Sequence, residues 1–485
     1  MSQTLLESPA VLRPTRATAI DDTADLLWLA LPMIGMTVSR MLMGFIDFFM
    51  VSQLGTAAQA AISPSTLLLF TIACVGMGMA QGVQTFVSQA EGRGEPERGG
   101  AYLWQTMYLA IAAALLSAPI AMFVPVWFPL VGKLGHHSPE MLSMEIQFLQ
   151  WGLWSIGPMT AAAGLESFFN GVKRPMIGLI AVIASLVTLA VGNWLLIFGH
   201  FGLPAMGIAG SGIATLAGWV VRVCVLAIAL RSRELDQKYR IRSALRIDLA
   251  KLGELLRVGG PVAFQWLVDI GAWLVFIELL IPPFGTASVA AANLAIQFMH
   301  LSFMPSIGLG IALTTQVGNA VGAGRLDEAE HRVRVARRVI LSYMGLMSLV
   351  FLFGGRVLAG LLCFEADADE HARVITAAAQ MLIWVAIFQI SDAICIVYSF
   401  AARGAGDTRV PALLFAVCCW GIFVVGGVLT SRFLPQFGPH GPWMMCTTYI
   451  IVLGVLLWRR FHGGKWRDIR IFAQRGDDAS PAAVH

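Results

Sequence analysis

Residues 176–199 have the sequence MIGLIAVIASLVTLAVGNWLLIFG, an apolar run that contains no charged side chain. A helix of about 20 such residues is long enough to cross the hydrocarbon core of a bilayer. The whole chain has this character, because 57% of its 485 residues are hydrophobic and only 13% are charged. Its mean hydropathy is +0.73. A water-soluble protein of this size could not bury so much apolar surface. The composition therefore excludes a soluble enzyme and a disordered chain, and it predicts an all-α polytopic membrane protein.

Similar apolar runs, separated by Gly, Pro and charged residues, occur along the chain and predict twelve transmembrane helices. The expected spans are residues 26–51, 62–87, 102–126, 142–165, 176–199, 208–230, 259–283, 289–318, 338–363, 375–402, 411–431 and 443–458. An even number of spans places both termini on the same side of the membrane.

The basic residues predict the orientation and the domain organisation. Most of the 33 Lys and Arg lie in the tails and in the loops after even-numbered spans. By the positive-inside rule, this pattern places both termini in the cytoplasm of a multi-pass protein of the cell (inner) membrane. We expect a cytoplasmic linker at 231–257 between two six-helix lobes, 25–230 and 258–460, and cytoplasmic tails at 1–24 and 461–485. The net charge of +4 is too small to suggest a nucleic-acid partner.

The chain partly matches itself at an offset of 230 residues, which carries Gly55 onto Gly285. The same offset aligns residues 87–94 (VSQAEGRG) with residues 317–324 (VGNAVGAG). Both members of each pair are expected on one side of the membrane, so the two lobes are predicted to be parallel repeats related by a pseudo-twofold axis. Two such lobes leave a cleft between them, and rocking of one against the other gives alternating access. The glycines of the second pair are expected to form helix caps and tight turns.

Charged side chains inside the spans are candidate functional groups, because a carboxylate at a helix centre costs about 2.5–3.5 kcal/mol on insertion scales. Asp47 lies late in the first span, Asp269 midway along the seventh and Asp392 midway along the tenth. Glu278 and Glu166 also lie in or at the end of spans, with roles left open. Asp269 and Glu278 are nine residues apart, so they face opposite sides of one helix.

The neighbours of Asp269 indicate the kind of substrate. A stripe of amide and aromatic side chains on its helix face suits an organic cation, through charge and ring faces. Together with an amide beside Asp392, this stripe gives the predicted substrate-cleft residues: Gln265, Trp266, Trp273, Phe276 and Gln389. The alternative is that these aromatic rings pack against lipid or a neighbouring helix. For Asp47, the alternative is a structural ion pair with Arg40, although seven residues span about 10.5 Å along a helix.

Several stretches then resemble the multidrug and toxic compound extrusion (MATE) family, over about residues 25–460. Residues 43–47 (MGFID) through 51–55 (VSQLG) resemble its first-helix motif, and residues 193–204 (NWLLIFGHFGLP) its junction of the fifth and sixth helices. Pro261 with Asp269 resembles the seventh helix, and residues 389–392 (QISD) the tenth. The similarity is greatest to the NorM-like branch.

The resemblance implies export of a small organic compound coupled to entry of Na⁺ or H⁺, by a protein that is not an enzyme and needs no cofactor besides the coupling ion. Asp269 and Asp392 would form the cation site of the C-terminal lobe, with Na⁺ as one candidate ion. The polar site of the N-terminal lobe would be formed by Asp47, Asn193 and Thr215. Membrane lipid is the other expected partner, and a monomer is expected to be functional. The branch usually has Glu at the Asp269 position.

Two other classes of protein remain as alternatives. A flippase of lipid-linked saccharides would need a cleft lined with Arg and Lys to hold pyrophosphate. The intramembrane candidates for that role are Arg40, Arg222 and Arg356. A membrane receptor or structural protein would not need the two-lobe repeat.

Overall fold

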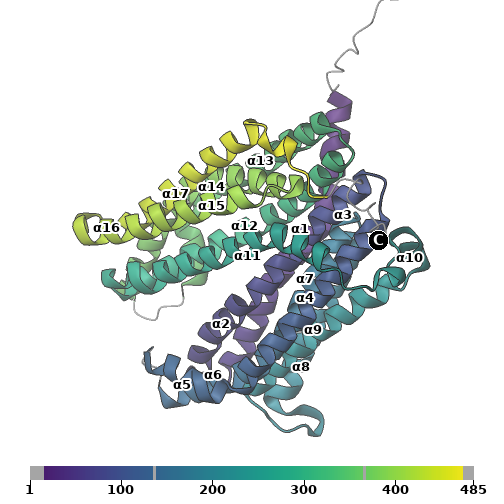
Figure 1. Ribbon diagram of the computed structural model, residues 1–485. Helices are drawn as coiled ribbons and strands as arrows, with labels where there is room; N and C mark the ends of the chain where they lie inside the picture. Colours follow the sequence, from purple (N-terminus) through teal and green to yellow (C-terminus); the bar gives the residue numbers. More distant parts are fainter. Residues whose placement is uncertain (1–15, 135–137, 364–367, 473–485) are drawn as a thin grey trace, which may run out of the picture.

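The computed structural model describes residues 16–134, 138–363 and 368–472 (Figure 1). Over these ranges the chain forms helices and contains no β-strand. The ends of the two predicted tails, residues 1–15 and 473–485, lie outside the described residues. The all-α fold class is confirmed.

In the part of the chain that the structure describes, nine α-helices build the N-terminal lobe. They are α1 (Arg16–Ser52), α2 (Thr56–Gln81), α3 (Val83–Gly92), α4 (Glu97–Met122), α5 (Val124–Leu134), α6 (Pro139–Gly152), α7 (Ile156–Gly171), α8 (Pro175–Phe198) and α9 (Ile208–Leu230). A short helix, α10 (Arg233–Tyr239), follows in the connection between the lobes. The helices α2 and α3 run on from one another through Gly82 and form one span.

Within the described ranges, seven α-helices build the C-terminal lobe. They are α11 (Leu249–Val275), α12 (Thr286–Gly322), α13 (Leu326–Leu362), α14 (Ala368–Ala405), α15 (Arg409–Cys418), α16 (Val425–Phe433) and α17 (His440–His462). Two π-helical segments interrupt this lobe, η4 (Phe276–Leu280) after α11 and η6 (Cys419–Val424) between α15 and α16. The seventh span begins at Leu249, inside the segment predicted as linker. There the Asp248 side chain caps α11 by accepting from the backbone N–H of Ala250 and of Lys251.

The structure has eleven helices, within the described ranges, that are long and apolar enough to cross a membrane. The remaining predicted span, 142–165, is a broken helix. Here α6 and α7 follow one another through a 3₁₀ turn at Leu153–Ser155. Pro158 has no N–H to donate to the carbonyl one turn earlier, which accounts for the interruption. The twelve-span prediction therefore holds, with the fourth span made of two helices.

The two lobes meet at one end of the molecule and diverge towards the other (Figure 1). They meet near α3 and α10, where the basic loops lie, and we call this the basic end. At the opposite end, α5 of the N-terminal lobe and α16 of the C-terminal lobe lie far apart in the view. Along the shared side, α1 packs against α12, α2 against α11 and α3 against α12.

The contacts at the basic end follow the predicted repeat. A Cβ atom on Gly92 would lie 2.0 Å from the carbonyl oxygen of Asn319, and one on Gly322 would lie 2.1 Å from that of Gln89. The offset of 230 residues relates Gly92 to Gly322 and Gln89 to Asn319, so the two contacts are reciprocal. Such reciprocity is what a twofold axis between the lobes requires. The glycines also end α3 and α12, as predicted.

Hydrogen bonds reinforce the same interface. Gln84 Nε2 donates to the carbonyl of Ile311 at 2.8 Å, and Thr85 Oγ1 donates to the carbonyl of Arg403 at 2.9 Å. The chain after α17 also crosses between the lobes. Trp466 stacks on Phe461 in the C-terminal lobe, whereas Phe472 is buried in the core of the N-terminal lobe.

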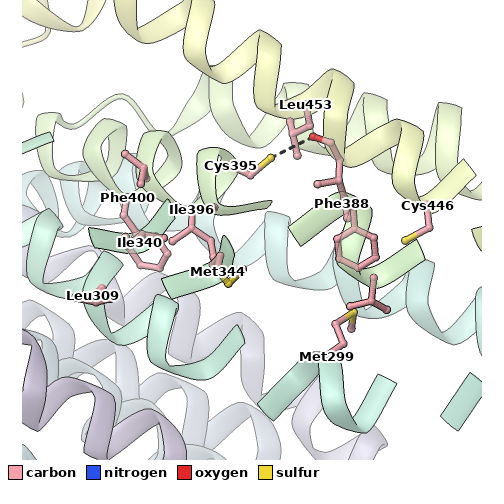
Figure 2. Close-up of a cluster of buried hydrophobic side chains, with 14 of the residues drawn as sticks. Met299, Leu309, Ile340, Met344, Phe388, Cys395, Ile396, Phe400, Cys446 and Leu453 are labelled. Atoms are coloured by element: carbon pink, nitrogen blue, oxygen red, sulfur yellow. Dashed lines mark hydrogen bonds between the residues drawn. The ribbon is translucent and has the colours of Figure 1, made fainter. Parts of the chain in front are cut away.

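The core of the C-terminal lobe lies between α12, α13, α14 and α17 (Figure 2). Phe388 and Met299 are buried there, and Cys395 Sγ donates to the carbonyl of Ile450 at 3.4 Å. These contacts fix α14 against α17, and they hold the helix that carries Asp392 in place.

Candidate functional site

The N-terminal lobe encloses Asp47 in a set of polar side chains. Asn193 Nδ2, from α8, donates to Asp47 Oδ1 at 2.7 Å, and Ser211 Oγ, from α9, donates to the same oxygen at 3.3 Å. The Thr215 hydroxyl faces this carboxylate without a hydrogen bond of good geometry. Asp47 is only 8% exposed and Asn193 is fully buried. The structure thus brings together the three residues predicted for this lobe and adds Ser211, which lies one turn before Thr215.

Arg40 belongs to a different group. It lies within electrostatic range of Glu166 on α7 and Arg222 on α9, and Arg222 Nε forms a buried ion pair with Glu166. The partners of Asp47 are the polar groups described above. The ion pair between Arg40 and Asp47, considered from the sequence, is therefore replaced by a cluster that we call the Arg–Glu–Arg cluster, made of Arg40, Glu166 and Arg222.

In the C-terminal lobe, α11 and α14 bring Asp269 and Asp392 close enough for their charges to repel one another. The indole N–H of Trp273, one turn after Asp269, lies within hydrogen-bonding reach of its carboxylate. Both aspartates are half-buried. Tyr449, on α17, lies within electrostatic range of both acids and is a member of this site that the sequence did not indicate.

The wall around the acid pair is aromatic. The rings of Trp273 and Phe423 lie 5.4 Å apart, and Phe423 stacks on Tyr449 at 5.2 Å. Phe423 lies in the π-helical segment η6, and Phe276 opens the other, η4. Segments of π-helix are frequent at functional sites, because the extra residue displaces side chains from their regular positions. In the described residues, the π-helical segments η4 and η6 both lie in the C-terminal lobe.

Two of the residues predicted for the substrate cleft are buried inside the C-terminal lobe. Phe276 is fully buried among Trp273, Phe423 and Trp443, because its ring packs inside the lobe. Gln389 is 1% exposed, because it turns towards α12 and donates to Ser302 Oγ at 2.8 Å. Both side chains stabilise the C-terminal lobe and do not face the space between the lobes.

The other cleft candidates lie closer to the second lobe. The Trp266 ring contacts Phe70 of α2 with centroids 5.9 Å apart, so it sits where the lobes meet. Gln265, its neighbour on α11, is half-buried. Glu278 is exposed and lies beyond the acid pair, in η4. Asp269 and Glu278 therefore lie apart. Their spacing of nine residues predicted this separation.

The side chains present limit how a metal ion could be held. In the described residues, no group of three or more His, Cys, Asp or Glu side chains is arranged to hold one. At the acid pair, the carboxylates of Asp269 and Asp392 are the strong oxygen ligands. The thiols of Cys419 and Cys446 lie nearby, and thiols are poor ligands for Na⁺. A cation bound here would rely on two carboxylates.

Comparison with known sequences gives matches over most of the chain. The MatE family model matches twice, at residues 32–195 and 264–429, once in each lobe. The probable multidrug resistance protein NorM of Rhizobium meliloti is 28% identical over 465 residues, which cover 94% of this chain and 95% of that protein. The multidrug resistance protein MdtK of Pectobacterium atrosepticum is 27% identical, covering 86% of this chain and 90% of that protein.

Solved structures have the same fold. The eukaryotic MATE transporter AtDTX14 aligns with a TM-score of 0.81 at 21% identity, covering 93% of this chain and 97% of that one. A multidrug resistance MATE family transporter in an outward-facing conformation aligns with a TM-score of 0.80 at 17% identity, covering 94% and 100%. The double match of the family model agrees with the repeat seen in the sequence and in the reciprocal glycine contacts. The chain belongs to the MATE family of membrane transporters and is not an enzyme.

Proposed function

We propose that this protein is a secondary active antiporter that exports organic, often cationic, compounds in exchange for Na⁺ or H⁺. The observation that carries the proposal is the acid pair of Asp269 and Asp392 inside the C-terminal lobe. Two carboxylates within electrostatic range of one another, in apolar and aromatic surroundings, need a cation or a proton to balance their charge. The names of the relatives, which are multidrug resistance proteins, support export of more than one compound.

Alternating access follows from the coupling between this charge and the packing of the lobes. A ligand shifts a two-state equilibrium only by its differential affinity for the two states. Cation binding at the acid pair removes the repulsion between Asp269 and Asp392, and it therefore favours a different position of α11 relative to α14. Because α11 also packs against α2 of the other lobe, a change at the acid pair reaches the interface between the lobes.

The orientation and assembly belong to the same proposal. The basic end faces the cytoplasm, with both termini, in the cell (inner) membrane, since Lys and Arg concentrate in its loops. The lobes, which diverge away from that end, then open outward (Figure 1). The protein functions as a monomer surrounded by lipid, and the substrate is a small organic molecule. The polar group of Asp47, Asn193 and Thr215 serves as a second cation or proton site.

The arrangement of arginines favours this function over a lipid-linked saccharide flippase. Arg222 is engaged by Glu166 inside the N-terminal lobe, and Arg356 is exposed on α13. These arginines do not line one surface that could hold a pyrophosphate group.

Efflux of cationic dyes from proteoliposomes tests the proposal. Dye-loaded vesicles that contain the protein are placed under a Na⁺ gradient or a pH gradient, each imposed alone. We expect efflux under at least one gradient, and we expect Asp392→Asn to reduce it to the level of empty vesicles.

Glu278→Gln is the matched control, since it removes an acid from the same lobe that lies outside the pair. It should retain gradient-driven efflux. Monodisperse elution in size-exclusion chromatography establishes that each variant is folded. Unchanged efflux by folded Asp392→Asn would contradict the coupling role of the acid pair, and ligand binding without flux in the wild type would contradict transport itself.

A further inference from the structure

The Arg–Glu–Arg cluster lies in the interior of the N-terminal lobe and takes no part in the function proposed above. Arg222 is 0% exposed and Glu166 is 6% exposed. Arg40 is half-buried and lies within electrostatic range of both. On α1 and on α9, seven residues separate the cluster from the Asp47 group, which is two helical turns or about 10.5 Å.

The charges of this cluster do not balance. A guanidinium group stays protonated in proteins, so the two arginines carry two positive charges against the single carboxylate of Glu166. Protonation of Glu166 would only increase the excess. The face of Trp219, 4.7 Å from Arg222 Cζ, offsets a small part of it.

The hydrogen-bond donors show the same deficit. Arg222 uses Nε to bind Glu166, but its Nη1 and Nη2 atoms are buried and have no hydrogen-bond partner among the protein atoms. Nε of Arg40 is also buried and also has no hydrogen-bond partner among the protein atoms. A buried charge without a counter-charge is costly, and a neutral donor or acceptor can satisfy the N–H groups but cannot neutralise the charge.

We propose that the N-terminal lobe binds a small monovalent inorganic anion, such as chloride, between the guanidinium groups of Arg40 and Arg222. Close packing nearby limits the size of the ligand. A Cβ atom on Gly178 of α8 would lie 2.5 Å from the Met36 sulfur of α1 and 3.7 Å from Glu166 Cγ. Helices in such close contact leave no room for the organic substrate, so the proposed ligand is a small ion. The site is separate from the Asp47 group and from the acid pair.

Thermal unfolding at constant ionic strength tests this site. The full-length protein in detergent micelles is melted in sodium gluconate, and chloride then replaces gluconate stepwise. Gluconate is too large for the site, so it controls for ionic strength. A ligand that binds only the native state stabilises it in a saturable manner. We expect the apparent melting temperature to rise by several degrees and then to level off, with bromide acting as chloride does.

Two single-charge variants make the test specific. Arg40→Gln removes the excess positive charge and leaves the Arg222–Glu166 pair in place, so we expect the chloride dependence to disappear. Arg356→Gln removes one intramembrane charge at an exposed position of the other lobe, and it should respond to chloride like the wild type. Arg40→Lys keeps the charge and should keep part of the response. A wild-type melting temperature that does not depend on chloride, or an equal response in Arg40→Gln, would overturn the proposal.

Bromide soaked into crystals of the protein gives the position directly. We expect anomalous density within hydrogen-bonding distance of the Nη atoms of Arg222 in the wild type, and its loss in Arg40→Gln. Density only elsewhere on the protein would overturn the assignment. Neither measurement requires transport, so an anion site can be found or excluded whatever the dye-efflux experiment gives.

Discussion

The interiors of the two lobes differ in charge, although their backbones are related. The N-terminal lobe holds one acid surrounded by hydrogen-bonding groups, and two turns nearer the basic end it holds the Arg–Glu–Arg cluster. In the C-terminal lobe, Asp269 and Asp392 face aromatic rings and thiols, and neither has a basic partner. An acid in the first lobe is therefore held by donors or an opposite charge, whereas the acids of the second lobe repel one another.

The repeat offset shows that the difference in charge lies at positions where the two halves of the sequence do not match. At 230 residues, Asp47 corresponds to Ile277 and Asp269 corresponds to Ser39, so no intramembrane acid of this set has an acid as its counterpart. By contrast, Gly92 and Gly322 correspond and make reciprocal contacts. The contacts between the lobes have kept the symmetry of the repeat, while the lobe interiors have lost it. A role for charge should therefore be assigned lobe by lobe.

The largest expected effect is a difference in stability between two variants, each of which lacks one buried acid of one lobe. Glu166→Ala leaves Arg222 and Arg40 buried without a counter-charge, and breaking a buried ion pair in this way costs about 3–5 kcal/mol. Asp269→Asn leaves no base unpaired and relieves repulsion with Asp392, so its stability should stay level or rise. Thermal unfolding of both variants in one detergent, at one scan rate, measures the difference. Similar destabilisation of the two variants would contradict the contrast between the lobes.

A second prediction concerns the donors around Asp47. Asn193→Ala removes the 2.7 Å hydrogen bond to the carboxylate, and hydrogen bonds to charged groups contribute about 1.5–3 kcal/mol. Thr215→Val is the matched control, because its hydroxyl makes no hydrogen bond of good geometry and its loss should be nearly neutral. Melting temperatures of the two variants give the comparison. Equal losses would mean that Thr215 holds Asp47 as firmly as Asn193 does.

A third prediction tests the symmetric part of the molecule. Gly92→Ala and Gly322→Ala each place a methyl group against a backbone carbonyl of the other lobe, and overpacking of this kind costs about 1–3 kcal/mol. Because the contacts are reciprocal, we expect the two variants to lose similar stability. Gly44→Ala, where no atom lies within 4 Å of the added Cβ, should be neutral. Unequal losses at Gly92 and Gly322 would show that the interface is less symmetric than its contacts suggest.

The sequence predicts the architecture well, because membrane spans are set by composition. The apolar runs gave the spans, and the recurrence of residues 87–94 at 317–324 gave the lobe symmetry. The fourth span was predicted, but the break within it was missed, because only Pro158 marks the break in the sequence. The short helix α10 lies in the segment expected to link the lobes.

The site was less predictable, since helical periodicity gives the face of a side chain but not the helix that it meets. Asp47 and Asn193 do come together, as the family resemblance implied. Phe276 shares a face with Asp269, yet the π-helical segment and α17 enclose its ring within the lobe. Arg40 and Arg222 belong to helices distant in sequence, so their meeting with Glu166 could be seen only once the helices were packed.

The smallest expected effect concerns Trp273, which serves the C-terminal lobe in two ways. Its ring packs against Phe276 and Phe423, and its N–H lies within reach of Asp269. Trp273→Phe keeps the aromatic packing and removes the donor. It should cost about 1 kcal/mol, less than the change at Asn193, because the indole N–H lies within reach of the carboxylate but does not make the short hydrogen bond that Asn193 makes. With that donor gone, the carboxylate depends more on its counter-cation, and the ion concentration needed for half-maximal dye efflux should change by up to about tenfold. Trp266→Phe, at the interface with Phe70, alters the other aromatic position without touching an acid and should leave that concentration unchanged. If both variants shift it equally, the ring rather than the N–H governs the acid pair, and the C-terminal lobe would then hold its acids without any donor at all.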